Sequence, residues 1–139
     1  MQKMTLLIIG DNMFISTNSL IINGISMGQY IVSAKYGYYK LWGKDSGRNL
    51  AGTQSGTFIG VFPKITMQFR QLSKSEVELL APILDSAYQS TTYYDANKKA
   101  TITMDTYSGD WVLENKSIIT ENETAEGFEW SVISTKKRS

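Results

Sequence analysis

Apolar and polar residues alternate along most of this chain, and a helical spacing is confined to one segment. Val, Ile, Thr and Tyr dominate the alternating stretches, and a period of two in such residues is typical of β-strands. The pattern therefore predicts a mainly β protein. The expected strands cover residues 20–22, 30–41, 56–62, 64–71, 90–94, 100–106, 110–113, 116–120 and 129–135, with Pro63 marking the break between the third and the fourth.

The aromatic stretch YGYYKLW, residues 36–42, has two different faces. Alternation places Tyr36 and Tyr38 on one face of the strand and Tyr39 on the other. At least one face is therefore expected to expose tyrosine, which suits a protein interface, with stacking on a ligand as the alternative. The stretch YDANKK, residues 94–99, predicts the turn of a β-hairpin.

The stretch LSKSEVELLAPILDSAYQ predicts one flanking α-helix near residues 73–88. Ser73 followed three residues later by Glu76 has the form of a capping box, which marks a helix N-terminus. Pro82 removes a backbone hydrogen bond inside this segment, so we expect a kink or an early end. The apolar stripe that should close the core consists of Val77, Leu80, Leu84 and Ala87, flanked by Leu79 and Ile83.

Composition narrows the possible chemistry. A chain of 139 residues that is 42% hydrophobic has the size and apolar content of one globular domain. It contains no cysteine and no histidine, which excludes thiol catalysis, disulfides, a histidine base and a zinc site. Any metal would therefore have to be a hard cation bound by oxygen ligands, and we assign no metal site and no cofactor from these residues.

Charge and hydropathy limit the partners. With 14 basic and 13 acidic residues, the chain has no net field that would favour nucleic acid. The basic run at residues 136–138 predicts a solvated tail. The apolar run at residues 4–9 is too short for a signal peptide, and no stretch reaches the roughly 20 apolar residues of a membrane span. We expect a soluble protein without a membrane partner.

Carboxylates are the remaining acid–base groups, and a glycosidase would need two of them. The candidates by elimination are Asp85, Asp95, Asp105 and Asp110, although capping of turns explains Asp95 and Asp110 as well. A solvated acidic loop is predicted around Glu121, Glu123 and Glu126. Weak calcium binding by these carboxylates is the alternative. The stretch GKD, residues 43–45, lacks the spacing of a phosphate-binding loop. The stretch GTQSG, residues 52–56, lacks the histidine partner that a serine nucleophile needs. We assign no catalytic residue.

Three stretches of the chain resemble a family of small virion-associated proteins encoded among the tail genes of tailed phages and prophages of Gram-positive bacteria. They are INGISMG, then GYYKLWGKDSGRNLAGTQSGTFIGVFPKITMQFRQLSKSEVELLAPILDSA, then TTYYDANKKATITMDTYSGDW, and the resemblance covers roughly residues 22–135. Its most specific part combines LWGKDSGRNLAGTQSGTFIG with LSKSEVELL and the GDW motif.

The resemblance implies an antiparallel β-sandwich, similar to tail tube and baseplate ring proteins, with the predicted helix beside it. It implies a non-enzymatic structural protein of the tail or baseplate, assembled in the cytoplasm of the bacterial host. Its partners would be copies of itself, in a ring expected to be hexameric, and other phage tail proteins. Family members usually begin near INGI, so residues 1–20 are interpreted as an N-terminal extension and residues 21–139 as a single domain.

The polar loop at residues 43–56 is long for a compact domain, which favours a functional role. We interpret it as a docking arm that becomes ordered against a neighbouring subunit. The predicted interface residues are Tyr39, Trp42, Lys44, Asp45, Arg48, Asn49 and Leu50. The alternatives are a carbohydrate-binding module of a receptor-binding apparatus and a carboxylate-based hydrolase.

Overall fold

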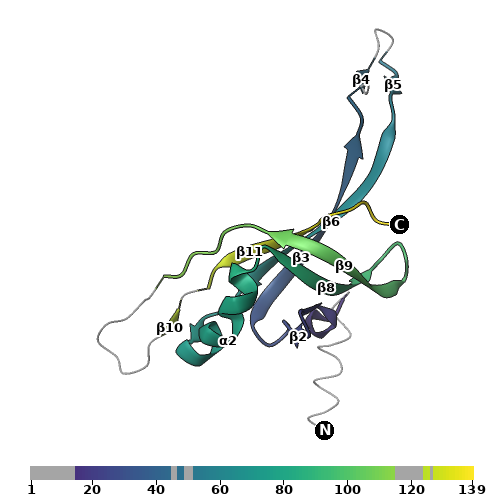
Figure 1. Cartoon of the computed structure of the whole chain (residues 1–139). Helices are drawn as coiled ribbons and strands as arrows, with labels where there is room; N and C mark the ends of the chain where they lie inside the picture. Colours follow the sequence, from purple (N-terminus) through teal and green to yellow (C-terminus); the bar gives the residue numbers. More distant parts are fainter. Residues whose placement is uncertain (1–14, 45–46, 49–51, 115–123, 126) are drawn as a thin grey trace.

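One antiparallel sheet of seven strands organises the chain (Figure 1). The computed structural model describes residues 15–44, 47–48, 52–114, 124–125 and 127–139. The strands of the sheet, in spatial order, are β2 (Ile25–Ser26), β1 (Ile21–Ile22), β8 (Tyr88–Asp95), β9 (Ala100–Ser108), β11 (Glu129–Ser134), β6 (Phe58–Phe69) and β3 (Ile31–Trp42). A short 3-10 helix, η1 (Thr17–Ser19), precedes β1, and the residue between them, Leu20, is buried.

Two smaller strand pairs lie outside this sheet. β4 (Gly47–Arg48) pairs with β5 (Gln54–Ser55) between β3 and β6, within the predicted docking loop. β7 (Leu72–Ser73) pairs with β10 (Thr124–Ala125) next to the one α-helix of the described residues. Residues 116–120, a predicted strand, and most of the predicted N-terminal extension lie outside the described residues.

The mainly antiparallel β fold with one flanking helix is confirmed, but the two-layered sandwich is not. The core strands belong to one sheet, which curls until its distant strands face each other. Tyr36 on β3 stacks on Tyr93 on β8 with ring centroids 6.3 Å apart, although three strands separate β3 from β8 within the sheet. The curled inner face and the helix together enclose the core.

β6 runs without a break through Pro63, so the predicted interruption is wrong. The carbonyl of Val61 accepts the backbone N–H of Arg138, so the backbone groups of Val61 point toward the β11 side of β6. Residues two apart in a strand point to the same side. The position where Pro63 lacks an N–H therefore faces the β11 side as well. The last β11 partner along β6 is Lys64. Pro63 therefore costs no hydrogen bond in the β11–β6 ladder.

The helix α2 (Lys74–Asp85) begins at the predicted capping box. The Ser73 hydroxyl accepts the Glu76 N–H at 3.4 Å, and the Glu76 carboxylate accepts the Ser73 N–H at 2.9 Å. α2 ends three residues after Pro82, as an early end predicts. Its buried residues are Leu80, Ile83 and Leu84, whereas Ala87 follows the helix and is exposed.

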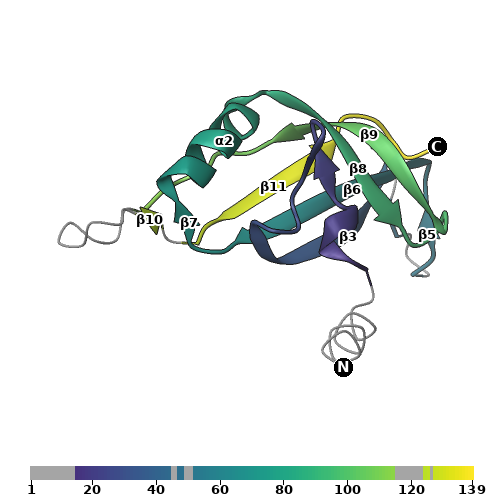
Figure 2. The same cartoon turned by 90° about the horizontal axis from the view of Figure 1, so that it is seen from below.

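The apolar core lies between α2 and the concave face of the sheet (Figure 2). Its largest fully buried side chains include Trp130, Tyr93, Phe69, Ile65 and Met67. Phe69 stacks on Phe128 at 4.6 Å. Within the part of the chain that is described, no helix has the length and apolar content needed to cross a membrane.

Candidate functional site

β3 and β6 form a two-stranded arm that projects beyond the rest of the sheet and carries β4 and β5 at its far end (Figure 1). We define the arm as the described residues between Tyr39 and Phe62. Its exposed large apolar side chains are Tyr39, Leu41, Trp42, Phe58 and Ile59. Neighbouring exposed side chains of this kind mark interaction surfaces more often than isolated ones do.

The pairing of the arm is irregular where the aromatic residues concentrate. Leu41 pairs with Gly60, but the next pair joins Trp42 to Phe58, so the ladder skips Ile59. The rings of Trp42 and Phe58 contact each other with centroids 5.0 Å apart, yet Trp42 remains 41% exposed. β-Bulges of this kind redirect side chains at sheet edges, and here the result is an exposed aromatic pair.

Tyr39 lies flat against its own strand. A side chain at Gly37 would clash with the Tyr39 ring, whose Cε2 atom would be only 2.5 Å from the added Cβ. The Nζ atom of Lys64 lies 6.0 Å from the centre of the same ring. Gly37 thus allows Tyr39 a fixed position with 58% of its surface still exposed.

The structure places the predicted interface residues as follows. Tyr39, Trp42 and Lys44 lie on the arm and are exposed. Arg48 belongs to β4, and Asp45, Asn49 and Leu50 lie outside the described residues. The alternation argument is confirmed, because Tyr36 and Tyr38 pack against the core while Tyr39 faces outward. The ordering of the loop against a neighbour stays a prediction.

A second exposed surface crosses the convex face of the sheet. Tyr88 pairs with Tyr107 across β8 and β9, Tyr107 with Ile133, and Ile133 with Lys64. Opposed residues share a face in an antiparallel sheet, so these side chains form one row that leads to Gly37 and Tyr39. Tyr88 is 71% exposed.

The C-terminal segment is held against the sheet by a buried carboxylate. Asp95, fully buried at the end of β8, accepts the Tyr93 hydroxyl at 2.7 Å and the Arg138 guanidinium at 3.1 Å. The backbone N–H groups of Asn97 and Lys98 also donate to it, which confirms a hairpin turn within the predicted stretch 94–99, although the turn itself is confined to residues 96–99. The Arg138 guanidinium lies over the ring of Tyr38 at 5.5 Å. The predicted solvated tail is therefore wrong for Arg138.

The charged form of Asp95 is stabilised by its donors. Burial alone would raise the pKa of Asp95, but the hydrogen bonds from Tyr93, Lys98 and Arg138 more than offset this effect, and the pKa lies below its usual value. Burial, followed by the hydrogen bond to Asp95, raises the pKa of Tyr93. The cluster is thus a neutral tyrosine and an ionised aspartate neutralised by Arg138.

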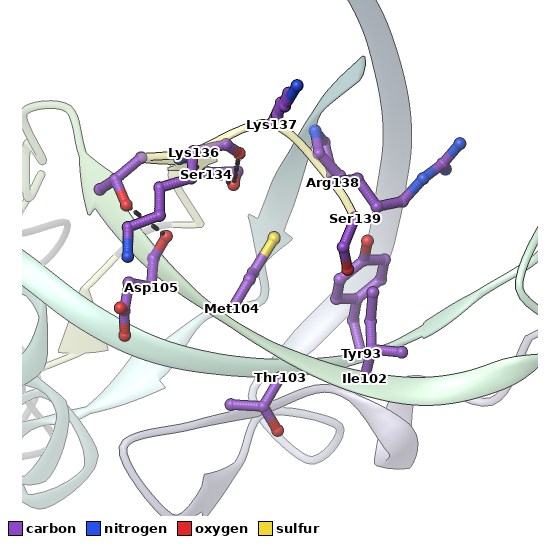
Figure 3. Close-up of a pocket in the computed structure, with 12 residues that line it drawn as sticks. Tyr93, Ile102, Thr103, Met104, Asp105, Ser134, Lys136, Lys137, Arg138 and Ser139 are labelled. Carbon is purple, nitrogen blue, oxygen red and sulfur yellow. Dashed lines mark hydrogen bonds between the residues drawn. The ribbon is translucent and has the colours of Figure 1, made fainter. Parts of the chain in front are cut away.

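A pocket of about 280 Å³ lies beside this segment (Figure 3). Met104 points into it, with Tyr93 and Arg138 at one end and Asp105 and Lys136 at the other. Arg138 is engaged by Asp95, and the Thr135 hydroxyl donates to the Asp105 carbonyl. The pocket contains one acidic side chain, whereas glycoside hydrolysis needs two.

The four candidate catalytic aspartates do not converge on one site. β8 separates Asp85 from Asp95 by roughly 25 Å, and Asp95 is enclosed by its donors. Asp85 and Asp110 do line a common groove. Glu121, Glu123 and Glu126, the calcium candidates, lie outside the described residues, and among the described ones no group of three acidic residues could hold a metal ion.

That groove lies between the C-terminal end of α2 and the segment at residues 109–114. It has a volume of about 530 Å³, and Leu84, Asp85, Trp111 and Val112 line it. The Trp111 Nε1 atom donates to Asp85 at 2.7 Å, which ties the segment to the helix. The predicted strand at residues 110–113 is wrong, because Trp111 packs against Phe128 instead of pairing in a ladder.

Val112, which lines the groove, is 73% exposed, so the groove has an apolar side chain at its opening. Sequence reasoning missed this groove, since only the fold brings the end of α2 next to residues 109–112. No protein-family model matches the chain, and no curated protein matches its sequence.

Proposed function

We propose that this protein is a non-enzymatic structural subunit that assembles with copies of itself through the projecting arm, as a component of a phage tail or baseplate. The observation that carries the proposal is the arm with its exposed Trp42 and Phe58 pair. The sequence resemblance supplies the setting. A ring and other tail proteins as partners follow from the same resemblance.

The geometry of the arm supports a docking role over a ligand site. Interfaces are enriched in aromatic residues, and a few buried aromatic anchors supply most of the binding energy. The exposed groups of the arm lie on a projection of two strands (Figure 1). A projecting surface of this kind can enter a neighbouring subunit, whereas small ligands prefer concave sites.

Trp42→Ala/Phe58→Ala tests the proposal. We expect the wild type to associate with rising concentration and to form rings in negative-stain electron microscopy. The double variant should associate at least about thirtyfold more weakly, because even one aromatic anchor is worth roughly 2 kcal/mol or more. Sedimentation velocity measures the association, and circular dichroism checks that the fold is intact.

Tyr88→Ala/Tyr107→Ala is the matched control, since it removes two exposed aromatic side chains away from the arm. It should assemble like the wild type. A wild type that stays monomeric at every concentration, or an arm variant that assembles unchanged, would contradict the proposal.

The row containing Tyr88 and Tyr107 supports carbohydrate binding as a second candidate, because exposed aromatic faces stack on sugars. Saturable binding of a purified cell-wall polysaccharide, lost in the Tyr88→Ala/Tyr107→Ala variant and kept in the arm variant, would favour this second function.

A further inference from the structure

The described residues of the arm and the lining of the groove carry opposite charges, although the net charge is only +1. The described part of the arm contains Lys40, Lys44 and Arg48 and no acidic residue. The lining of the groove contains Asp85 and Asp110 and no basic residue. The arm and α2 lie at opposite ends in both views (Figures 1 and 2).

The end of α2 has an unbalanced negative potential. The carbonyl end of a helix carries a partial negative charge that basic side chains usually neutralise. The last turn of α2 has no basic residue, and its final residue is Asp85. Asp110 lies on the same groove, so a cation supplied from outside would be stabilised here.

We propose that the groove between α2 and residues 109–114 receives the arm of a neighbouring copy, so that subunits join head to tail. This inference rests on the proposed function and adds the receiving surface. Trp42 and Phe58 would enter the groove against Val112 and Leu84. Lys40 and Lys44 would approach two acidic residues. Asp110 lines the groove, and Glu114 lies two residues beyond the last lining residue, Val112.

A second copy of this chain is the occupant that the structure favours. The arm supplies both features that the groove lacks, an apolar projection and positive charge. The arm cannot reach the groove of its own subunit, because the two lie at opposite ends. Contacts between two different surfaces repeat from copy to copy and generate rings or filaments.

Two charge-reversed variants test the pairing. The arm variant is Lys40→Glu/Lys44→Glu, and the groove variant is Asp110→Lys/Glu114→Lys; all four residues are exposed. Asp85 is left unchanged because it accepts the Trp111 hydrogen bond. Lys98→Glu/Lys99→Glu is the control for the arm variant, because it makes the same change in net charge on the exposed β8–β9 turn.

Each variant alone should remain monomeric at concentrations where the wild type and the control assemble. An equimolar mixture should assemble with the two variants alternating, because the basic arm of the groove variant fits the acidic groove of the arm variant and the acidic arm of the arm variant fits the basic groove of the groove variant. The variant with all four substitutions should assemble again. Sedimentation velocity distinguishes these species, and circular dichroism confirms that each variant is folded.

Assembly of the groove variant at wild-type strength would overturn this inference and leave the proposed self-assembly intact. Failure of the mixture to assemble, with both variants folded, would also overturn it. A wild type that never assembles would refute both the groove and the proposed function.

Discussion

At the scale of single residues, a buried carboxylate fixes the C-terminal segment. Asp95 has no exposed surface, and its bond to Arg138 joins positions 43 residues apart in the chain. Removal of one partner of a buried pair leaves a desolvated charge, which costs more than the pair itself contributes. The segment around Arg138 is therefore part of the fold.

Arg138→Gln should lower the free energy of unfolding by about 2 to 3 kcal/mol, because Asp95 loses a charged donor while Tyr93 and the turn still bind it. Urea denaturation measures the change. Lys136→Gln is the control, since it removes the same charge from an exposed side chain, and should change stability by less than about 0.5 kcal/mol. Equal effects of the two substitutions would mean that the ion pair contributes nothing specific.

At the scale of elements, the start of α2 depends on one glutamate. The hydrogen bond from Arg70, at 2.6 Å, and then the Ser73 backbone N–H lower the pKa of Glu76 to about 2. Arg70 also donates to the carbonyls of Gln29 and Gln71, so Glu76 links the helix to the loop before β3.

Because the pKa of Glu76 is lowered in the folded state, its contribution to stability is complete above the unfolded value of 4.5 and is lost as the pH falls toward about 2. Glu76→Gln should destabilise the protein at pH 7 by about 1 kcal/mol, after allowance for solvent screening of this partly exposed pair. The difference from the wild type should shrink below pH 4.5.

Thermal unfolding between pH 2 and pH 7 measures this difference. Ser73→Ala removes the other half of the capping box, and because the Ser73 hydroxyl lowers the pKa of Glu76 less than Arg70 does, its cost should change with pH less than that of Glu76→Gln. A Glu76→Gln difference that does not change with pH would show that the capping contact, and not the ionised pair with Arg70, stabilises the helix.

Elements that depend on local signals could be predicted from the sequence. The capping box of α2, the turn at residues 96–99 and the outward face of Tyr39 all follow from spacing within a few residues. Where neighbours distant in sequence decide the structure, prediction failed. Trp111 sits against α2 instead of in a strand, and Arg138 binds a carboxylate that no local pattern relates to it.

The candidate site also has a part that local sequence patterns predict and a part that only the fold brings together. Exposed tyrosine on the aromatic strand follows from alternation, and the arm follows from the length of the polar loop. The groove required the fold, because its two walls come from α2 and residues 109–112. The curl of the sheet was also missed, since strand periodicity does not report how far a sheet closes on itself.

At the scale of the whole molecule, the separated charges give the assembly a predicted response to salt. Raising sodium chloride from about 0.1 M to about 1 M shortens the Debye length from about 10 Å to about 3 Å. If Lys40 and Lys44 meet the acidic rim of the neighbouring groove, the dissociation constant of the wild type should rise at least about tenfold over this range, which is roughly 1.4 kcal/mol.

The response to salt distinguishes the contribution of charge from the contribution of apolar contacts to docking. Contacts of Trp42 and Phe58 with apolar surface are not weakened by screening of charge, so an assembly held by these rings alone would keep its affinity in salt. The variant with all four charges reversed provides the matched control, because its arm and groove remain complementary and it should weaken with salt as the wild type does. A wild-type dissociation constant that stays unchanged up to 1 M salt would show that the aromatic pair alone drives docking, and that the separated charges have no part in it.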